Sequence, residues 1–381
     1  MKDAVAIIDV GSTSLVTMIG EAGVNNTFNI CGKGEIFYAG FQNAEFLEPE
    51  NLKMVVANSV SNAEISADKK IYELYVGVPG EFCACVTKTI NLTFPKYKKV
   101  TEFDVNNIFE TGNDFKNDPM YTVINKSVIY YDIDGAKRVI DPIGLKAKSI
   151  TGYISYVLAR KSFVGMFKSI FAELKIMVKG FISANLAEGL YLFDPKTRDR
   201  YALLVDIGYI TTNVALFRGN GLLFLNSFSL GGGYITSDLA ECLKISFSEA
   251  EKIKHKIVLG WKAGPNDIYE VDGNEGQIKT YSASAANEIV ADRVEMICEY
   301  IQRCLDNCIY ALPDFLPVNL TGGGFNFIRG IKSTISNKLK RKVNFVAPSY
   351  PNLNGPDFSS EVGLIYLVLK NNNILDTMLE N

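Results

Sequence analysis

The sequence predicts an α/β protein of two domains, and the main reason is a duplicated unit of three strands. The stretch VAIIDVGSTSLVTMIG, residues 5–20, is an apolar run ending in Asp9, a turn with glycine and hydroxyl residues, and a second apolar run. The stretch LLVDIGYITTNVALF, residues 203–217, repeats this order around Asp206. The chain has 381 residues, and a single core usually stops growing at about 250–300 residues.

The composition is that of an ordinary globular protein. Hydrophobic residues make up 48% and charged residues 21%, and the formal net charge of −3 gives no attraction to nucleic acid or anionic lipid. Seven cysteines without a Cys-x-x-Cys pair and a single histidine argue against a metal or disulfide framework. With no signal-peptide pattern and no apolar run of roughly 18 residues, we expect a cytoplasmic protein.

Apolar periodicity and cap residues assign the elements of the first half of the chain. The first three-strand unit is predicted at 4–10, 14–20 and 28–38, and it is followed by a helix that Pro49 opens and that runs to about residue 66. The remaining predicted elements are strands at 71–78 and 82–94, a capped helix at 101–112, strands near 121–132 and 145–154, and a helix over about 156–174.

The second half begins with the repeated three-strand unit, predicted at 201–207, 211–218 and 221–229. A glycine-rich turn then leads into a helix at 230–243, and a serine cap predicts a helix over 246–260. The later predicted elements are a loop with short strands at 262–282, a long helix at 285–311, a strand, turn and helix at 318–335, a strand at 343–347 and a closing helix at 359–369.

The two turns that follow Asp9 and Asp206 contain the residue types that indicate a binding function. A turn of glycine and hydroxyl residues between buried strands exposes backbone N–H groups to which a phosphate can bind, although one such turn alone is weak evidence. The two aspartates that end the preceding strands, Asp9 and Asp206, have the oxygen ligands that Mg²⁺ prefers. Two such units in one chain predict a pair of phosphate-binding turns with a metal ion between the carboxylates.

Two further motifs add to this pattern. The stretch TGGG, residues 321–324, lies where a strand passes into a helix, and a helix N-terminus favours phosphate. Glu251 and Lys254 are one helical turn apart and are suited to hold ribose hydroxyls or a base. Alone, that pair is more often a surface salt bridge. Together and in this order, the four signals are specific.

In this order the motifs resemble the superfamily of actin, sugar kinases and chaperone ATPases, and within it the FtsA family of cell-division proteins. The resemblance implies an actin-like fold, that is, a duplicated ribonuclease-H-like fold of two domains with an FtsA-type inserted subdomain and a nucleotide in the interdomain cleft. The segments that carry it are AIIDVGSTSLVTMIGE, YAGFQNAEFLEPENLKMVVANSVSNAEI, LYVGVPGEF, LGGGYITSDLAECLKISFSEAEKIK, LTGGGFNFIRGI and SSEVGLIYLVL.

The resemblance also implies the domain boundaries. The implied parts are the first domain at 1–82 and 159–198, the inserted subdomain 1C at 83–158, the second domain at 199–240 and 313–358, its subdomain 2B at 241–312, and a C-terminal helix with a short tail at 359–381, which returns to the first domain.

By position, the resemblance assigns Asp9 and Asp206 to the metal side of a site for ATP and Mg²⁺. It implies no particular catalytic residue. The residues that it assigns to the nucleotide are Gly11, Ser12 and Thr13 in the first phosphate loop, Gly208 and Thr211 in the second, Gly232 and Gly233 in the cleft, Glu251 and Lys254 at the nucleoside, and Gly322, Gly323 and Gly324 in the adenosine loop.

The family further implies head-to-tail filaments, capture of the FtsZ C-terminal tail, contact with other divisome proteins, and a place at the inner face of the cell membrane at the division site. No nucleic acid is expected as a partner. Arg293, in the predicted long helix, is our candidate for binding the acidic FtsZ tail, and a solvated arginine is the alternative interpretation.

The second loop departs from the family pattern, which usually reads Asp-x-Gly-Gly-Gly-Thr-x-Asp. Here Tyr209 and Ile210 replace glycines, and Asn213 replaces the last aspartate. Tyrosine and isoleucine adopt positive φ only at a cost, so we expect the backbone to stay away from a γ-phosphate. Neither Asn185 nor Glu188 is an obvious residue for positioning the attacking water. These departures predict slow or absent ATP hydrolysis.

The last residues, LKNNNILDTMLEN, depart as well, because a membrane-binding helix needs a basic polar face and this one is acidic. We expect a frayed end or a partner-binding stub, with indirect or weak membrane association. Three other functions stay open: a PilM-like scaffold of a pilus or secretion assembly, a nucleotide-free degenerate actin-like platform, and a kinase of the same fold. The sequence shows no catalytic Asp motif for the kinase.

Overall fold

The computed structural model describes residues 4–24, 27–272 and 277–372, so most of the predicted C-terminal tail lies outside the described residues. The chain divides into two compact units. Unit 1 comprises Met1–Ala202, Ala215–Asn226 and Ser360–Asn381, and unit 2 comprises Leu203–Val214 and Ser227–Ser359. The finer subdomain boundaries that the resemblance implies stay a prediction.

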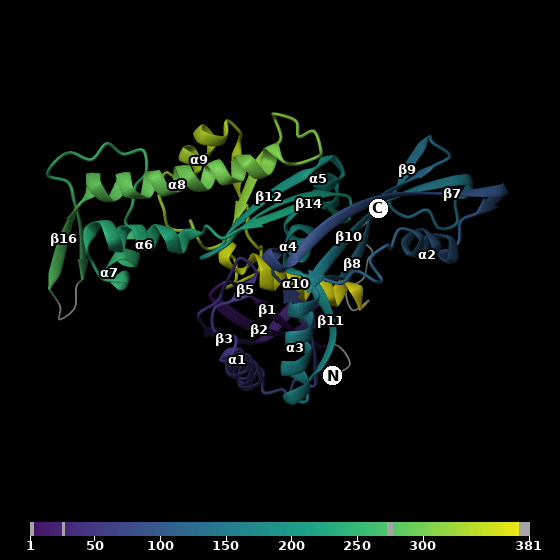
Figure 1. Ribbon diagram of the computed structural model, residues 1–381, viewed down its shortest axis with the longest axis horizontal. Helices are drawn as coiled ribbons and strands as arrows, with labels where there is room; N and C mark the ends of the chain where they lie inside the picture. Colours follow the sequence, from purple (N-terminus) through teal and green to yellow (C-terminus); the bar gives the residue numbers. More distant parts are fainter. Residues whose placement is uncertain (1–3, 25–26, 273–276, 373–381) are drawn as a thin grey trace. The chain divides into compact units, whose positions relative to one another are not determined.

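Unit 1 contains the first predicted three-strand unit as part of a five-stranded sheet (Figure 1). Its strands, in the order in which they pair, are β11 (Met177–Ser183), β6 (Glu73–Val78), β1 (Ala4–Val10), β2 (Ser14–Ala22) and β3 (Phe28–Phe37). β1 is antiparallel to β2 and parallel to β6. This arrangement places the β1–β2 turn, which carries the predicted phosphate loop, directly after Asp9.

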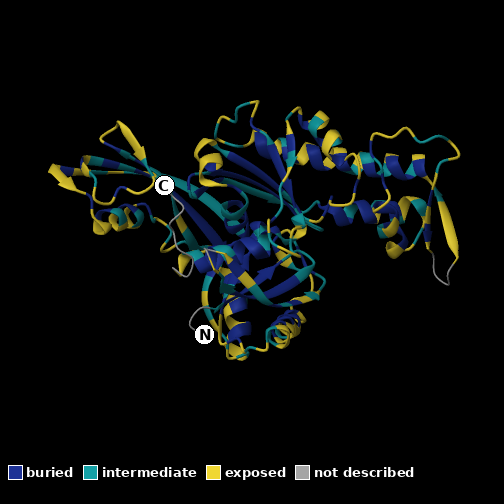
Figure 2. Cartoon of the chain, turned by 180° about the vertical axis from the view of Figure 1, so that it is seen from behind, coloured by how far each residue is buried: buried dark blue, intermediate teal, exposed yellow. Residues whose placement is uncertain are grey.

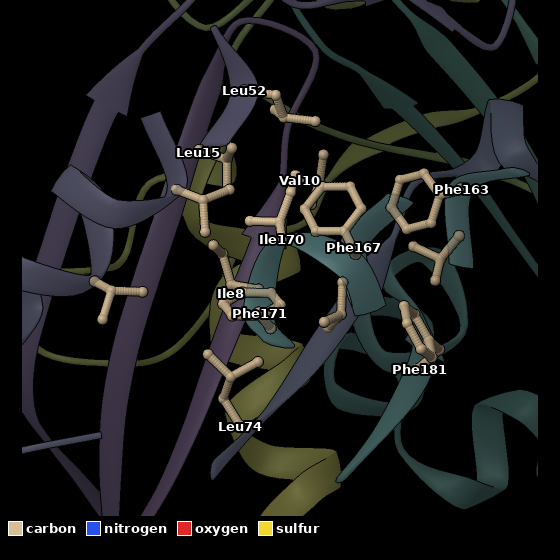
Figure 3. Close-up of a cluster of buried hydrophobic side chains, with 14 of the residues drawn as sticks. Ile8, Val10, Leu15, Leu52, Leu74, Phe163, Phe167, Ile170, Phe171 and Phe181 are labelled. Carbon is tan, nitrogen blue, oxygen red and sulfur yellow. The ribbon is translucent and has the colours of Figure 1, made fainter. Parts of the chain in front are cut away.

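Helices α1 (Leu52–Ala67) and α3 (Lys161–Glu173) complete the core of this sheet. Figure 3 shows Ile8 and Leu15 of the first two strands in one apolar cluster with Phe163, Phe167 and Phe171 of α3. The ring centroids of Phe163 and Phe167 are 4.6 Å apart. The aromatic side chains of α3 are therefore part of the core, and they pack against the sheet that contains β1 and Asp9.

The helix predicted over 156–174 is wrong at its start, because residues up to Arg160 belong to strand β10 (Lys146–Arg160). β10 pairs with β7 (Cys83–Lys99) on one side and with β8 (Tyr121–Ile133) on the other, and β9 (Lys137–Val139) completes a four-stranded sheet. Pairing with β7 and β8, which are distant in the sequence, keeps β10 extended as far as Arg160. Helix α2 (Glu102–Thr111) has the predicted cap, with reciprocal hydrogen bonds between Thr101 and Asp104.

Unit 1 has three further helices, α4 (Ala184–Leu192), α5 (Pro195–Arg200) and α10 (Ser359–Asn371), the last of which begins one residue before the unit does. The sequence predicted no helix or strand in the segment that forms α4 and α5. α1 begins three residues after Pro49. The short strands β4 (Phe41–Gln42) and β5 (Glu45–Phe46) pair before α1.

The repeated three-strand unit lies in a second five-stranded sheet, with the order β14–β13–β12–β17–β18. These strands are β12 (Ala202–Ile207), β13 (Thr212–Arg218), β14 (Gly221–Phe228), β17 (Val318–Thr321) and β18 (Val343–Phe345). β12 and β17 run parallel, so Asp206 and Thr321 are register partners. The predicted duplication is confirmed, and it brings the TGGG motif beside the second aspartate.

The helices of unit 2 are α6 (Gly232–Leu243), α7 (Phe247–Lys254), α8 (Ala283–Asp306) and α9 (Ile331–Leu339). One apolar face of α8 is buried, and Figure 2 shows buried and exposed residues alternating along that helix. The residues of this face are Val290, Val294, Ile297, Ile301 and Leu305. β15 (Ile268–Asp272) and β16 (Ile278–Ser282) pair antiparallel and are the short strands predicted within 262–282.

Helix α7 ends at Lys254, whereas the sequence predicted an end at Gly260. The chain leaves the helix because Val258 forms a bridge with Arg329, and the backbone N–H of Leu259 donates to the Arg329 carbonyl at 2.8 Å. Within the described residues, no helix combines the length and the apolar character that crossing a lipid bilayer requires.

Candidate functional site

The first predicted phosphate loop is the hairpin turn between β1 and β2, whose last register pair is Val10 and Leu15. Tyr38 holds this turn: its hydroxyl donates to the Gly11 carbonyl at 2.8 Å, and its backbone N–H donates to the Thr13 carbonyl at 3.0 Å. Ser12, between them, is half-buried. The turn is thus a fixed, partly exposed backbone loop, as a phosphate-binding loop requires.

Asp9 precedes this turn and is only 6% exposed. Burial, and then the negative charge of Asp9, raise the pKa of Tyr38 well above its usual range, so the Tyr38 phenol stays a hydrogen-bond donor at neutral pH. Asp9 also lies against Gly77 of β6, where an added Cβ would be 2.9 Å from Asp9 Oδ1. The structure therefore places a carboxylate inside unit 1 immediately behind the loop.

In unit 2, the predicted nucleotide residues from three distant segments meet through their backbones. The Gly208 N–H donates to the Thr211 carbonyl at 2.8 Å and closes the second turn. The Gly232 N–H at the start of α6 donates to the Gly208 carbonyl at 2.9 Å, and the Gly324 N–H donates to the Ile207 carbonyl at 2.7 Å. The second loop, the start of α6 and the TGGG motif thus form one glycine-rich cluster.

Two of these glycines are required by space. A Cβ on Gly232 would lie 2.2 Å from the Gly324 carbonyl oxygen, where backbone meets backbone. A Cβ on Gly322 would lie 2.4 Å from Asp206 Oδ1, and the φ of +88° at Gly322 is one that other residues rarely adopt. Gly322 therefore allows the chain to pass directly beside the Asp206 carboxylate. Gly323 faces Asp357 instead.

The Asp206 carboxylate accepts a hydrogen bond from Asn213, the residue that differs from the family pattern. Burial raises the pKa of Asp206 to about 6, and a hydrogen bond from Asn213 acts in the opposite direction. Asn213 Nδ2 donates to Asp206 Oδ2 at 2.9 Å, and Asn213 Oδ1 accepts from the Ser227 hydroxyl at 2.6 Å. Asn213 thus supplies a donor to this carboxylate where the family pattern has a second acid.

Tyr209 lies in the same cluster. Its φ and that of Ile210 are not positive, as expected for these residue types. The Tyr209 carbonyl accepts from the Gly233 N–H at 2.7 Å, and its ring covers Gly233, where an added Cβ would lie 2.5 Å from Tyr209 Cε1. The Lys254 ammonium is 5.3 Å from the centre of the Tyr209 ring. Tyr209 therefore links the second turn to the Glu251–Lys254 pair.

The Glu251–Lys254 pair is more than a surface salt bridge, because Lys254 is only 4% exposed. Its Nζ is 3.3 Å from Glu251 Oε1 and donates to the Thr236 hydroxyl at 3.4 Å. The Thr236 hydroxyl donates in turn to Glu251. Burial lowers the pKa of Lys254, and Glu251 offsets part of that effect. The pair is a built polar site on α7, next to the glycine cluster.

Arg293, our candidate for the acidic FtsZ tail, is engaged within unit 2. Its Nε and Nη2 donate to the two carboxylate oxygens of Asp238 on α6, at 2.5 and 2.8 Å, and its guanidinium is 5.8 Å from the centre of the Tyr234 ring. It is not the freely solvated arginine of the alternative interpretation. Its part in partner binding stays a prediction.

Sequence reasoning missed one acidic residue, Glu361 in the first turn of α10, which is only 6% exposed. Its Oε2 has no hydrogen-bond partner among the described residues. A glutamate near the start of an amphipathic helix is ordinary in a sequence, so no signal was available. On α4, Asn185 and Glu188 are 3% and 1% exposed, and Asn185 Oδ1 also lacks a partner in the described chain.

The donor atoms of these acidic and amide side chains are carboxylate and amide oxygens, which fit a hard divalent cation such as Mg²⁺. Two of these atoms, Glu361 Oε2 and Asn185 Oδ1, are buried without a hydrogen-bond partner in the part of the chain that the structure describes. The described residues contain no group of three or more His, Cys, Asp and Glu side chains arranged to hold a metal. A cation here would therefore depend on one or two carboxylates together with water or phosphate oxygens, which is how Mg²⁺ is usually bound.

Comparison with known proteins gives a consistent result. The family model described as "Cell division protein FtsA" matches residues 203–363. The FtsA protein of Staphylococcus epidermidis is 24% identical over 378 residues, which cover 97% of this chain and 80% of that protein. The FtsA protein of Escherichia coli K12 is 22% identical over 379 residues, covering 94% of this chain and 89% of that protein.

Solved structures show the same fold. A PilM–PilN type IV pilus biogenesis complex aligns with a TM-score of 0.63 and 14% identity, over 95% of this chain and 97% of that one. MreB5 of Spiroplasma citri bound to AMPPNP aligns with a TM-score of 0.57 and 11% identity, over 98% and 99%. At these identities the likeness concerns the fold alone, and it confirms the predicted actin-like fold.

Proposed function

We propose a function from the family: the chain is an FtsA-like, actin-like cell-division protein, and we infer that it binds ATP with Mg²⁺, forms filaments and links the FtsZ ring to the membrane or to other divisome proteins. It would act in the cytoplasm, at the inner face of the cell membrane at the division site. Hydrolysis would be slow or absent.

One observation supports nucleotide binding more than any other. In unit 2, residues of the second turn, the start of α6 and the TGGG motif meet in one cluster around the half-buried Asp206. Close backbone packing without side chains, as at Gly232 and Gly322, is what phosphate and nucleoside binding needs. Unit 1 carries the matching turn after Asp9.

The proposed residue roles follow the sequence assignment. Asp9 and Asp206 would serve the Mg²⁺ ion, which supplies positive charge to the phosphates when bound. Gly11, Ser12 and Thr13 would bind phosphate through the first turn, and Gly208 and Thr211 through the second. Gly232 and Gly233 would line the nucleotide cleft, and Glu251 and Lys254 would face the nucleoside. The adenosine loop would be formed by Gly322, Gly323 and Gly324.

Slow hydrolysis is proposed from the same cluster. Asn213 donates a hydrogen bond to Asp206, so it neither binds a cation as an acid would nor accepts a proton from water. Tyr209 covers Gly233 where the family pattern has small residues. Nucleotide would then serve mainly as a ligand that stabilises the folded state by mass action.

The direct test is calorimetry of ATP and ADP binding with Mg²⁺, on the wild type and on Asp9→Ala and Asp206→Ala. Micromolar binding that each substitution weakens would support the proposal. Sedimentation with ATP would then test for filaments, and phosphate release would measure hydrolysis. The absence of binding at millimolar nucleotide would refute the ATP-binding part of the proposal.

The FtsZ contact has its own test. Fluorescence anisotropy with a labelled FtsZ C-terminal peptide would be measured for the wild type, Arg293→Ala and Arg303→Ala, two arginines of α8. We expect only Arg293→Ala to weaken binding. Because Arg293 pairs with Asp238, the melting temperature of each variant must be compared as well. Equal peptide affinity of all three proteins would remove Arg293 from the proposed contact.

A second candidate is a nucleotide-free interaction platform, and one observation favours it. The N–H groups of Gly232 and Gly233 at the start of α6 already donate to carbonyls of the second turn, and Lys254 already contacts Glu251 and the Tyr209 ring. Groups proposed for the nucleotide are thus paired within the protein. The calorimetry separates the two candidates, since a platform of this kind binds no nucleotide.

A further inference from the structure

The inference starts from the burial of Glu361. This residue lies in the first turn of α10, is 6% exposed, and has an Oε2 without a hydrogen-bond partner among the described residues. Native proteins pair nearly all buried polar atoms, because an unpaired one loses its hydration without compensation. A buried carboxylate in this state needs a physical explanation.

Asp9 is a close neighbour of Glu361. An added Cβ on Gly77 would lie 2.9 Å from Asp9 Oδ1 and 2.5 Å from Leu364 Cδ1, so the Asp9 carboxylate and α10 meet over this one residue of β6. Leu364 follows Glu361 by three positions, which places the two side chains on the same face of the helix. If both side chains were ionised without a cation, Asp9 and Glu361 would repel each other in a poorly hydrated environment.

Nearby positive charge does not offset this repulsion. The positive charge of Lys33 favours the ionised form of Glu361. The Lys33 ammonium is, however, 3.0 Å from the Glu35 carboxylate, whose negative charge disfavours that form. The N-terminal end of α10 favours an acid in its first turn, yet helix-end effects are small compared with the desolvation of a buried ion. Two buried carboxylates side by side become favourable when a divalent cation neutralises both.

The neighbouring helix supplies more oxygen atoms. An added Cβ on Gly363 would lie 2.8 Å from the Cα of Glu188, so α4 and α10 pack backbone against backbone. α4 thus brings the buried Glu188 to the first turns of α10. One turn earlier on α4 stands Asn185, whose buried Oδ1 lacks a partner among the described residues. Carboxylate and amide oxygens are ligands that suit Mg²⁺, Ca²⁺ and Mn²⁺.

We propose that Glu361 and Asp9 together bind one divalent cation, Mg²⁺ in the cell, and that unit 1 holds this cation before any nucleotide arrives. Two carboxylates satisfy part of the octahedral shell of Mg²⁺, and water or phosphate fills the rest. The proposal rests on the proposed function, because Asp9 is the metal-side carboxylate there. It adds a ligand on α10 and makes cation binding independent of nucleotide.

The experiment uses Mn²⁺ as the probe, since its free form is measured by electron paramagnetic resonance. The full chain would be titrated without nucleotide, as the wild type and as Glu361→Gln, Asp9→Asn and Glu173→Gln. Glu173 is the matched control because it is an exposed acid of the same unit. We expect Glu361→Gln and Asp9→Asn each to weaken Mn²⁺ binding at least tenfold, Glu173→Gln to change nothing, and Mg²⁺ to displace Mn²⁺ from the wild type.

A second measurement keeps the test valid if a variant folds differently. In EDTA, Glu361→Gln should melt no lower than the wild type, because glutamine has the size of the buried glutamic acid without its carboxyl group. In Mg²⁺ the wild type should gain melting temperature and Glu361→Gln should gain less. Equal Mn²⁺ affinity of the wild type and Glu361→Gln would overturn the inference and leave Glu361 a buried neutral acid.

The two proposals can fail separately. If Glu361→Gln binds Mn²⁺ and ATP as the wild type does, the cation inference is wrong and the proposed function stands. If the wild type binds Mn²⁺ through Glu361 but binds no ATP, the cation site stands and the ATP-binding function is wrong. If the wild type binds neither ligand, both are wrong.

Discussion

Gly322 decides how closely the TGGG motif approaches Asp206. Its φ is +88°, and an added Cβ would lie 2.4 Å from both Asp206 Oδ1 and the Ile207 carbonyl oxygen. The left-handed conformation alone disfavours a side chain, and the contact with the carboxylate adds to that cost. At the scale of single residues, the cluster in unit 2 therefore depends on the absence of one methyl group.

We predict that Gly322→Ala lowers the free energy of unfolding by more than the roughly 1–2 kcal/mol expected for a left-handed alanine, and that it also weakens ATP binding. Gly135→Ala is the matched control, because Gly135 has a φ of +71° but open space around its Cβ position. Urea unfolding and calorimetry measure the two effects. Equal losses of stability in both variants would show that the contact with Asp206 is unimportant.

Among the elements, α2 illustrates a helix end fixed by local chemistry. Asp104 accepts hydrogen bonds from the Thr101 N–H at 2.9 Å, the Thr101 hydroxyl at 2.8 Å and the Lys98 ammonium at 2.8 Å. Burial by itself would raise the pKa of Asp104, but the bonds from Lys98 and Thr101 outweigh it and hold the pKa below its usual value. The folded state therefore favours the ionised carboxylate.

Because the pKa of Asp104 is lower in the folded than in the unfolded state, its contribution to stability is present above about pH 4 and is lost as the pH falls through the lowered value. We predict that Asp104→Asn costs about 1 kcal/mol at pH 7 and that the difference from the wild type shrinks at lower pH. Urea unfolding over pH 3–7 measures it. A pH-independent difference for Asp104→Asn would contradict this account.

The packing of α1 on β3 is a second element-scale feature. An added Cβ on Gly34 of β3 would lie 2.1 Å from the Ser59 carbonyl oxygen of α1, so strand and helix touch through their backbones. The buried Ser59 hydroxyl accepts or donates a 2.8 Å hydrogen bond with Thr17 of β2 at the same place. This contact seats α1 on the sheet that carries Asp9.

We predict that Gly34→Ala costs about 1–3 kcal/mol or more, because the helix must move away from the strand. Gly180→Ala on β11 is the control, since its nearest contact is the Tyr75 ring at 3.3 Å, which can shift. Thermal unfolding of the two variants measures the difference. A Gly34→Ala protein as stable as Gly180→Ala would show that this helix contact is loose.

At the scale of the whole molecule, each of the two units carries one aspartate of the proposed ATP site, Asp9 in unit 1 and Asp206 in unit 2. A ligand that binds only the folded state raises stability by about 2.7 kcal/mol when its concentration is 100 times its dissociation constant. If both units contribute to one ATP, loss of either aspartate should reduce this gain.

We therefore predict that ATP with Mg²⁺ raises the melting temperature of the wild type in a concentration-dependent way, and that Asp9→Ala and Asp206→Ala each abolish most of the rise. Differential scanning calorimetry measures it, with EDTA as the test of the metal. A full rise that survives in one of the two variants would mean that the unit carrying that substitution contributes little to ATP binding.

The sequence by itself determined the features that arise from short stretches of chain. Strand-ending aspartates, glycine turns and the two capping boxes at Thr101 and Ser246 depend on neighbours within a few residues, and all lie where predicted. The actin-like fold was implied by the resemblance of the order of these motifs to that of the actin superfamily. The roles assigned to Asp9, Asp206 and the glycines remain predictions, although the structure shows how the unit 2 residues converge.

Only the tertiary structure decided what depends on distant partners. Residues up to Arg160 are strand because β7 and β8 flank them, which overrides their helical pattern. Arg293 pairs with Asp238, 55 positions away, and the burial of Glu361 beside Asp9 arises from the packing of α10 on β6. Spacing along a chain records local geometry, whereas burial and charge pairing depend on which surfaces the fold brings together.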